Sequence, residues 1–486
     1  MKQLSLILSL LVLISSCGNR NTCVCSNGQC DTLVIISTND VHSQIHDMPK
    51  LAAYVQSQRD SFRHVLLLSA GDMFSGSPVV DKYKERGYPM VDLMNRTGYK
   101  AAVLGNHEFD YGQEVLIRRI HDAHFDFLAA NAAFTNDLRD MVKPYIIVNV
   151  NGLKVAVLGF IETGDAGIPS TLPENLEGAK FADALSLVDT YRSLRDSAEV
   201  FLVLSHLGLR DDVRLAELLP EADAIIGGHS HTVLPNGLDT CGVMISQSGA
   251  YLQHIAKTTL LLKDGKVVTK KSGLIAVESL SAVDTVIQQL VDEYRNYPAL
   301  KATVGRATAD ITGKEALGNL MSDAMRAVHN FDIAVFNSGG LRTDSFPEGN
   351  ISFEDVYKLD PFENQLYVYN LTMEELASLL KDTYNDKKSD MLRISGAQYT
   401  LISDPDDNNK ALHIDITGYN DQPLPPKAVY KVGMSSYIRG RFIPLVNPKD
   451  EGRRIKVTTA ETLLQYLQRG PVSPQPPRTK IVTRNS

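Results

Sequence analysis

Five short motifs rich in metal-binding residue types each follow an apolar segment of this chain. They are Asp40-Val41-His42, Gly71-Asp72, Gly105-Asn106-His107-Glu108, Ser205-His206 and Gly228-His229-Ser230-His231. Carboxylate, imidazole and amide donors suit Zn, Mn, Fe or Co, because mixed hard and borderline ligands favour these ions. Two such ions, about 3.5–4 Å apart, can activate water and bind a phosphoryl oxygen during in-line displacement. The motifs therefore predict a binuclear metal centre, in which Asp72 is the candidate bridging ligand.

The five apolar segments before these motifs have the composition of buried strands. They cover residues 33–36, 65–68, 101–104, 200–204 and 224–226. Short runs of Val, Ile and Leu without polar alternation are typical of strands covered on both faces. Because the ligand site of an open α/β sheet lies at the carboxyl ends of its strands, the five motifs can converge there. Asp40 and His42 alternate along a strand, so both can reach one ion only if the chain turns at this point.

Strand and helix patterns alternate over residues 31–275, which favours an α/β fold. Two hairpins are predicted in this region, at residues 145–160 with an Asn151-Gly152 turn and at residues 258–269 with an Asp264-Gly265 turn. Hairpins beside such units indicate either a mixed sheet or two sheets stacked between helices.

Residues 281–297 predict a helix that connects two domains, and we place the linker at 276–300. Ser281 and Asp284 have the spacing of a variant capping box, and Pro298 ends the pattern. The apolar stripe of this helix consists of Val283, Val286, Ile287, Leu290 and Tyr294.

A second unit is predicted over residues 301–470. It contains a helical pattern at 318–328, a buried strand at 333–336, and a helix that begins at Thr372 with Glu375 as its capping partner. The remaining residues, 471–486, hold four prolines and several charges. We expect them to form a frayed tail.

Length and composition limit the class of protein. A chain of 486 residues is too long for one core, so two large domains are expected. The hydrophobic content of 43% and charged content of 22% are ordinary for a soluble globular enzyme. A net charge of −8 argues against a partner that is a nucleic acid polymer. Since Trp is absent, Tyr and Phe are the only aromatic stacking surfaces.

The N-terminal residues have the pattern of a bacterial lipoprotein signal. Lys2 precedes an apolar run over residues 4–14, and Ile14-Ser15-Ser16-Cys17 has the form of a lipobox. Eleven helical residues span about 16 Å, which is short of a bilayer core of about 30 Å. We therefore predict a signal peptide at 1–17, lipidation of Cys17 and a tether at 18–30. The alternative is a plain secretory signal that contains a Cys.

Four further cysteines fit an oxidising compartment outside the cytosol. They are Cys23, Cys25, Cys30 and Cys241. Four thiols allow three disulfide pairings, and the sequence does not choose among them.

The motif set resembles the calcineurin-like metallophosphoesterases, and among them the 5′-nucleotidase family. Thr38-Asn39-Asp40, Phe109-Asp110 and the segment from Asn337 to Arg342 narrow the resemblance to that family. It covers residues 31–470. The resemblance implies an α/β protein with a four-layer αββα metallophosphoesterase domain at 31–275, followed by a smaller α/β domain at 301–470 that binds the nucleoside.

The same resemblance implies a role for each motif residue. One metal would be held by Asp40, His42, Asp72 and His231, and the other by Asp72, Asn106, His206 and His229. Activated water would attack phosphorus with no covalent enzyme intermediate. His107 would lie near the phosphate, where it stabilises charge or protonates the leaving oxygen. Asp110 would fix the tautomer of that imidazole.

The second unit has residues suited to a nucleoside. Gly339 and Gly340 let the backbone approach a ligand closely, and Arg342 can donate a bidentate hydrogen-bond pair. In the family, Asn337 and this Arg contact the nucleoside. Pro361-Phe362-Glu363-Asn364 resembles the family's Pro-Phe-x-Asn, whose Phe stacks on the base. Tyr437 lies where the opposing aromatic usually falls, although both rings could instead be core residues.

Three departures from the family pattern stand out. Ser43 replaces the Gly that often follows the first metal-binding His. Ile438-Arg439-Gly440-Arg441-Phe442 replaces a Gly-Gly-Asp-Gly turn whose Asp helps to bind ribose or base. An Arg often found before Gly318-Asn319 is missing, and Lys314 is the nearest cation.

We therefore expect a lipid-anchored cell-envelope enzyme that releases phosphate from extracytoplasmic nucleoside monophosphates. It would face the periplasm or decorate the outer membrane. Hydrolysis of UDP-sugars or 2′,3′-cyclic nucleotides is the enzymatic alternative. A lipoprotein that binds nucleotides or metals without turnover is an alternative from another class.

Overall fold

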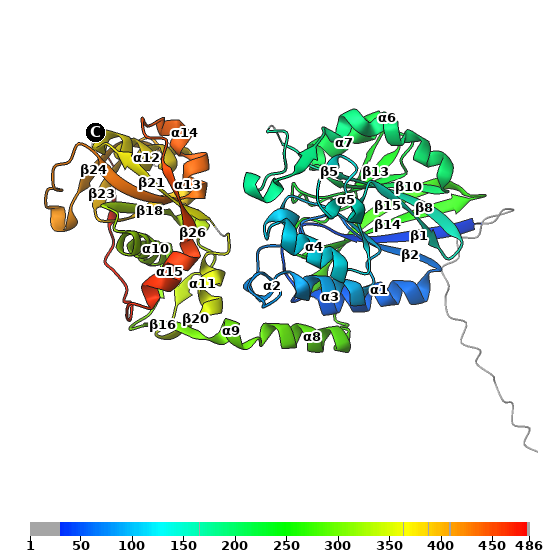
Figure 1. Cartoon of the computed structure of the whole chain (residues 1–486), viewed down its shortest axis with the longest axis horizontal. Helices are drawn as coiled ribbons and strands as arrows, with labels where there is room; N and C mark the ends of the chain where they lie inside the picture. The colour runs from blue at the N-terminus through cyan, green and yellow to red at the C-terminus, as the bar shows by residue number, and fades with distance from the viewer. Residues whose placement is uncertain (1–29, 165, 363, 387, 408–409, 484–486) are drawn as a thin grey trace, which may run out of the picture.

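The computed structural model describes residues 30–164, 166–362, 364–386, 388–407 and 410–483. The chain forms a first lobe (residues 30–276) and a second lobe (residues 303–483). Figure 1 shows α8 (Thr285–Arg295) and α9 (Pro298–Lys301) running from the first lobe to the second along one side. The predicted signal peptide at 1–17, with Cys17, lies outside the described residues, and so do residues 18–29 of the predicted tether, with Cys23 and Cys25.

Two sheets form the centre of the first lobe. The seven-stranded sheet has the order β15 (Lys266–Ala276), β14 (His254–Lys263), β1 (Cys30–Thr38), β2 (His64–Ser69), β3 (Ala101–Val103), β4 (Asp126–Leu128) and β6 (Val142–Lys143). The six-stranded sheet has the order β12 (Leu238–Thr240), β13 (Val243–Ser246), β11 (Ala224–Gly227), β10 (Val200–His206), β8 (Leu153–Ile161) and β7 (Tyr145–Val150). A short pair, β5 (Ala132–Phe134) and β9 (Ala179–Phe181), stands apart.

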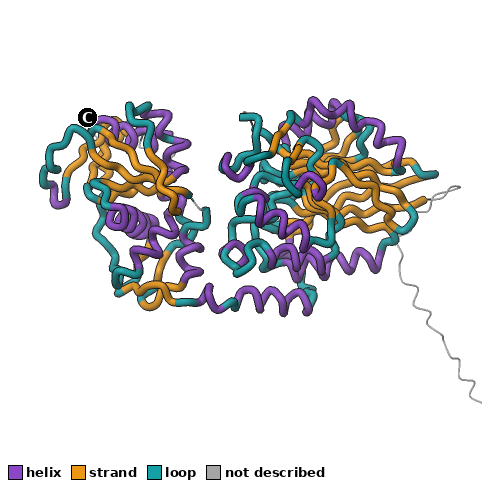
Figure 2. The backbone as a smooth tube through the Cα atoms, viewed as in Figure 1, coloured by secondary structure: helices purple, strands orange, loops and turns teal. Residues whose placement is uncertain are grey.

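The two sheets stack face to face and each is covered by helices, as Figure 2 shows. Along β1, Leu33 and Ile35 belong to the core between the sheets, whereas Val34 and Ile36 belong to the core under the helices. Both faces of the strand are therefore buried, which is why its apolar run shows no alternation. These layers confirm the four-layer αββα fold and settle the open choice in favour of two stacked sheets.

Helices of the first lobe divide between the two outer faces. The core of the seven-stranded sheet's outer face includes α1 (Met48–Ser61), α2 (Pro78–Asp81), α3 (Tyr88–Thr97), α4 (Gln113–Asp122), α5 (Leu138–Met141) and α8. The core on the other sheet includes α6 (Val188–Tyr191) and α7 (Leu209–Leu218).

The second lobe is a smaller α/β unit. Its five-stranded sheet has the order β22 (Leu392–Ser395), β18 (Ile333–Asn337), β25 (Tyr430–Ser435), β21 (Gln365–Leu371) and β26 (Arg453–Thr458). One face packs on α10 (Gly313–His329), α11 (Phe353–Leu359) and α15 (Thr459–Leu467). The other packs on α12 (Met373–Asp386), α13 (Ser436–Arg441), α14 (Ile443–Val446) and a sheet of β24 (Ala411–Thr417), β23 (Gln398–Ser403) and β27 (Thr479–Thr483). Two small pairs complete it: β16 (Thr303–Ala307) with β20 (Gly349–Ser352), and β17 (Ile311–Thr312) with β19 (Ser345–Phe346).

Local turn and capping signals are confirmed where they are specific. β7 and β8 pair from Val150 to Leu153, and the turn residues Asn151 and Gly152 have φ of 52° and 102°. β14 and β15 form the second predicted hairpin. At the start of α12, Thr372 and Glu375 exchange the two hydrogen bonds of a capping box.

Two predictions about the connecting helix are wrong. The N-cap of α8 is Asp284, whose side chain accepts from the N–H groups of Val286 and Ile287, so Ser281 lies outside the helix. Val283 and Val286 are exposed, because α8 packs on the first lobe through Ile287, Val291 and Tyr294.

The C-terminal segment is docked rather than frayed. β27 pairs in parallel with β23 over five residue pairs. Before it, the buried Arg478 makes a bidentate ion pair with Asp323 and a hydrogen bond to the Ile394 carbonyl.

Cys30 is disulfide-bonded, whereas Cys241 is an exposed free thiol. Cys241 is therefore excluded from the disulfide pairings that the sequence left open. Within the described part of the chain, no helix is both long and apolar enough to cross a bilayer.

Candidate metal centre and substrate cavity

The five motifs meet at the carboxyl ends of strands in the two stacked sheets. β1, β2 and β3 are parallel neighbours, and so are β10 and β11, so each group presents its carboxyl ends together. After β1 the chain turns, because the N–H groups of Asp40 and His42 bond to the carbonyls of Gly71 and Asp72. This turn brings both side chains to the same side, as their spacing required.

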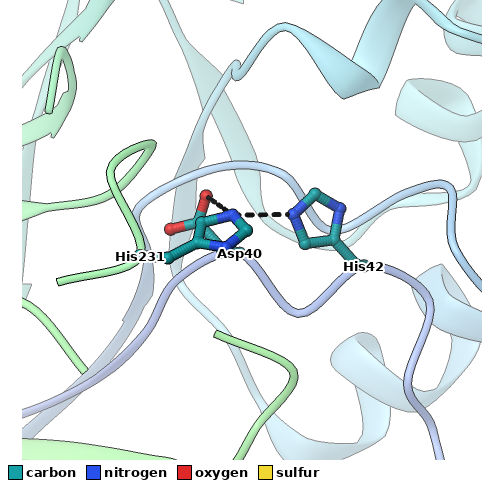
Figure 3. Close-up of side chains that lie close together, drawn as sticks. All are labelled: Asp40, His42 and His231. Carbon is teal, nitrogen blue, oxygen red and sulfur yellow. Dashed lines mark hydrogen bonds and ion pairs between the residues drawn. The ribbon is translucent and has the colours of Figure 1, made fainter. Parts of the chain in front are cut away.

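Asp40, His42 and His231 form the first ligand cluster (Figure 3). The Nε2 atoms of His42 and His231 face each other at 3.1 Å, and His231 Nε2 lies 3.4 Å from Asp40 Oδ1. His42 Nδ1 donates to the Ser75 carbonyl at 3.1 Å, which leaves its Nε2 available as a ligand.

Asp72, His206 and His229 form the second ligand cluster. His206 Nδ1 donates to the Ala70 carbonyl at 2.7 Å, so its Nε2 is the free ligand atom. Asp72 Oδ2 lies 3.1 Å from this Nε2 and 4.0 Å from Nε2 of His42. One carboxylate oxygen thus lies within reach of both clusters, which is the arrangement a bridging ligand needs.

Asn106 lies beside the second cluster with its amide orientation fixed. Its Nδ2 donates to the Ser170 carbonyl at 3.2 Å, and its Oδ1 lies 3.2 Å from His229 Nδ1. A neutral oxygen is therefore presented to the same space as the imidazole.

The backbone of this site is unusual. Asp40, His42, Asp72, His229 and His231 all have positive φ, between 48° and 73°. Such conformations are uncommon for non-glycine residues and concentrate at functional sites. Gly105 allows the closest approach, since a Cβ there would lie 2.2 Å from Asp72 Oδ1.

The donor set fits divalent cations. His206 Nε2 is buried, and Asp72 Oδ2 lies 3.1 Å from it without the alignment of a good hydrogen bond. Burial lowers the pKa of His206, but the neighbouring Asp72 carboxylate outweighs burial and raises that pKa to about 10. The Asp72 carboxylate thus favours a positive charge on its neighbour, and a bound cation would supply this charge. Burial lowers the pKa of His42 and of His229, which keeps both imidazoles in the neutral form that binds metals.

His107 and Asp110 form a pair at the edge of the metal cluster. His107 Nδ1 lies 2.6 Å from Asp110 Oδ2, and the His107 backbone N–H donates to Asp72 Oδ1 at 3.0 Å. Burial lowers the pKa of His107, whereas Asp72 and then Asp110 outweigh burial and raise that pKa to about 9. His107 also belongs to a third group of potential metal ligands, with His42 and Asp72, so its freedom from metal remains a prediction.

A cavity of about 830 Å³ opens above these residues and extends to the second lobe. The first lobe contributes His42, Asp72, Asn106, His107, Asp110, His229 and His231 to its lining. The second lobe contributes Arg342, Lys358, Phe362, Asn364 and Ser436, among others. Contacts between the lobes beside it include the ion pair of Arg454 with Glu174, and Lys82 placed 4.4 Å above the Tyr357 ring.

Known proteins are similar to most of this chain. The trifunctional nucleotide phosphoesterase protein YfkN of Bacillus subtilis is 26% identical over 470 residues, which cover 84% of this chain and 32% of that protein. This chain therefore spans about a third of that relative. The 5′-nucleotidase of Diplobatis ommata is 25% identical over 476 residues, covering 84% of this chain and 82% of that protein.

Two family models match in tandem, calcineurin-like phosphoesterase over residues 33–233 and 5′-nucleotidase C-terminal domain over residues 298–442. The chain belongs to the 5′-nucleotidase family. The match indicates a hydrolase that acts on phosphoric esters. Calcineurin-like phosphoesterase domains use divalent metals, and the ligand clusters of this chain are candidate sites for them.

Solved structures of this family share the fold. The 5′-nucleotidase precursor of Thermus thermophilus matches with a TM-score of 0.69 and 24% identity, over 93% of this chain and 99% of that one. A putative 5′-nucleotidase of Staphylococcus aureus matches with a TM-score of 0.74 and 18% identity, over 93% and 100%.

Some residues expected to bind the nucleoside do not line the cavity. Among the described residues, Asn337, Gly339, Gly340 and Tyr437 are not part of its lining. Tyr437 packs edge-on against Phe442 at 5.9 Å and donates its hydroxyl to Asp390 at 2.8 Å.

The arginines that replace the family's acidic turn are already engaged. Arg439 lies 4.9 Å above the Tyr367 ring, and Arg441 pairs with Asp386 at 2.8 Å. Lys314, at the place of the missing Arg, bonds to the carbonyls of Leu341 and Thr343. It therefore supports the loop of Arg342.

Several residues of the site have no role that was predicted from the sequence. Glu108 is fully buried and accepts from the N–H groups of Asp72, Met73 and Gly105. It therefore joins the loop that carries Asp72 to the loop that carries Asn106. Tyr251 lines the cavity with its ring 5.4 Å from that of His42. Glu108 stands inside a motif and could have been suspected, whereas Tyr251 has no motif of its own.

Proposed function

We propose that the chain is a metal-dependent 5′-nucleotidase that releases phosphate from extracytoplasmic nucleoside monophosphates. The observation that supports this most is the position of Asp72 Oδ2 between two ligand clusters, 3.1 Å and 4.0 Å from their imidazole nitrogens. The clusters lie at the end of a cavity whose other wall presents an arginine and an exposed aromatic ring.

The proposed ligands divide into two sets. Asp40, His42, Asp72 and His231 would hold one ion, and Asp72, Asn106, His206 and His229 the other. Zn, Mn, Fe and Co suit these donors. When bound, such a pair of ions supplies positive charge for the phosphate and lowers the pKa of water.

Residues of the chain supply the proton and the orientation. His107 directs its Nδ1 at Asp110, so its Nε2 is the atom left to protonate the leaving oxygen. Asp110 keeps the ring in this tautomer and stabilises its charged form.

Arg342 and Phe362 form the proposed nucleoside subsite. The Arg342 guanidinium lies 4.6 Å above the Phe362 ring and covers one of its faces, while 46% of Phe362 is exposed. A base can stack on the opposite face, which contributes roughly 1–3 kcal/mol. Asn364 lines the same wall. Asn337, Gly339, Gly340 and Tyr437 stay proposed contacts through the family resemblance alone.

We assign the metallophosphoesterase domain to 31–275, the linker to 276–300 and the substrate-binding domain to 301–470, with the segment up to residue 483 docked on it. Lipidation of Cys17 would anchor the mature protein in the cell envelope. Palmitate labelling of the wild type and of Cys17→Ser tests that anchor, and equal labelling of both proteins would reject it.

A substrate panel tests the function. Purified protein with added Mn²⁺ or Zn²⁺ should release phosphate from AMP, and Asp72→Asn should abolish the release. Because a similar protein is a nucleotide phosphoesterase with three activities by name, the panel includes UDP-glucose and 2′,3′-cyclic AMP. If the protein hydrolyses UDP-glucose or 2′,3′-cyclic AMP but not AMP, the proposed 5′-nucleotidase activity is wrong and the activity on that substrate takes its place. Binding of AMP without turnover of any substrate would favour the non-catalytic lipoprotein.

A further inference from the structure

Ser75 contacts three parts of the site. These are the His107–Asp110 pair, the proposed metal ligand His42 and the buried Tyr111. Its hydroxyl donates to Asp110 Oδ2 at 2.6 Å and lies 3.0 Å from His107 Nδ1. Its carbonyl accepts from His42 Nδ1 at 3.1 Å, and its N–H donates to Tyr111 Oη at 3.0 Å. One residue that belongs to none of the five motifs therefore contacts all three.

These bonds fix the Asp110 carboxylate. Its Oδ2 accepts from both His107 and Ser75, and its Oδ1 accepts from Thr171 Oγ1 at 3.0 Å. With both oxygens held, the plane of the carboxylate is set, and the imidazole follows it through Nδ1. Without the Ser75 hydroxyl, the carboxylate loses one of its three side-chain donors.

A buried network holds Ser75 in place. Tyr111 Oη donates to Asp81 Oδ1 at 2.5 Å, and Asp81 Oδ2 accepts from the Gly76 N–H at 2.8 Å. Ser43 Oγ also donates to Asp81 Oδ1, at 2.8 Å. Ser43 is thus an additional donor at the position where the family often has Gly. Because Asp81 and Tyr111 are buried and bonded, the network is rigid and supports the positive φ of 54° at Ser75.

We propose that Ser75 is a positioning residue that aims His107 at the leaving oxygen and so favours esters whose leaving group needs a proton. This inference rests on the proposed function. In the step concerned, water bonds to phosphorus and gives a proton to solvent. The phosphorus–oxygen bond to the nucleoside breaks with its electron pair on oxygen, and the His107 Nε2 proton moves to that oxygen.

The dependence on the leaving group follows from acidity. A nucleoside 5′-oxygen leaves as a strongly basic alkoxide unless it is protonated, so a misplaced acid slows its departure. The 4-nitrophenolate ion is a weak base and leaves without a proton. A defect in positioning therefore affects AMP far more than 4-nitrophenyl phosphate, whereas a defect in metal binding affects both substrates.

Ser75→Ala tests the inference, because it removes the hydroxyl and keeps both backbone bonds. We expect kcat for AMP to fall about 10–100-fold, as for other orienting partners. The KM for AMP, kcat for 4-nitrophenyl phosphate and the metal content should stay near wild type. Ser57→Ala is the matched control, since that hydroxyl bonds to the Tyr54 carbonyl on the exposed side of α1.

Thr171→Val supplies a second variant that removes the other side-chain anchor of Asp110 from a surface loop. It should show the same selective loss on AMP. Equal losses on both substrates, loss of metal, or unchanged AMP turnover in Ser75→Ala would overturn the inference. A wild-type protein that hydrolyses neither substrate would overturn the proposed function instead.

Discussion

Truncation of Phe362 separates nucleoside binding from phosphate chemistry. The Phe362 ring is 46% exposed and lines the cavity, so Phe362→Ala leaves no closed void behind. We therefore expect the melting temperature to change little. The variant loses a stacking surface worth roughly 1–3 kcal/mol per base. Since each 1.4 kcal/mol is tenfold in affinity, KM for AMP should rise about 5–150-fold.

The assay compares AMP with 4-nitrophenyl phosphate, which has no base. KM for the aryl phosphate should remain near the wild-type value, because the metal ligands and His107 are untouched. Leu445→Ala is the control, since Leu445 is an apolar residue of the same lobe, 52% exposed and away from the cavity lining. Equal losses on both substrates would refute the assignment and make Phe362 a structural residue.

Three further perturbations have defined outcomes. Asp72→Asn should lower the metal content by elemental analysis as well as the activity, because a bridging carboxylate serves both ions; full metal content would contradict the bridge. His107→Ala should lower kcat for AMP about 10²–10⁴-fold with the metals retained, and parallel loss of metal would show it to be a ligand. Arg478→Ala should destabilise the second lobe by about 3 kcal/mol in urea unfolding, because Asp323 loses its buried partner; an unchanged midpoint would mean that this ion pair adds no stability.

The parts of the fold with local signals could be predicted from the sequence. Apolar runs predicted the strands that precede the motifs. Asn151-Gly152 predicted a hairpin, because its two-residue turn requires positive φ at both positions and these residue types adopt it readily. The start of α8 could not be chosen, since Ser281 and Asp284 are both capping types. Packing against the first lobe decides it, and this packing has no local signature.

The candidate site shows the same division. The proposed ligands stand in motifs directly after strands, so their convergence followed from topology. Ser75 and Thr171 act on Asp110 from 35 and 61 residues away, and no periodicity indicates such contacts. The docked C-terminal segment depends likewise on Arg478 meeting Asp323, 155 residues earlier.

The left-handed backbone at five of the proposed ligands has a consequence for how this centre tolerates change. Asp, Asn and His enter that conformation far more readily than β-branched or bulky residues do. A residue at each of these positions must therefore offer a donor atom and also adopt the left-handed backbone conformation. Glycine would preserve the path of the chain without a ligand, and glutamate would offer an oxygen on a less suitable backbone. Conservative exchanges between acidic residues are thus expected to be disruptive here, even where the charge is kept.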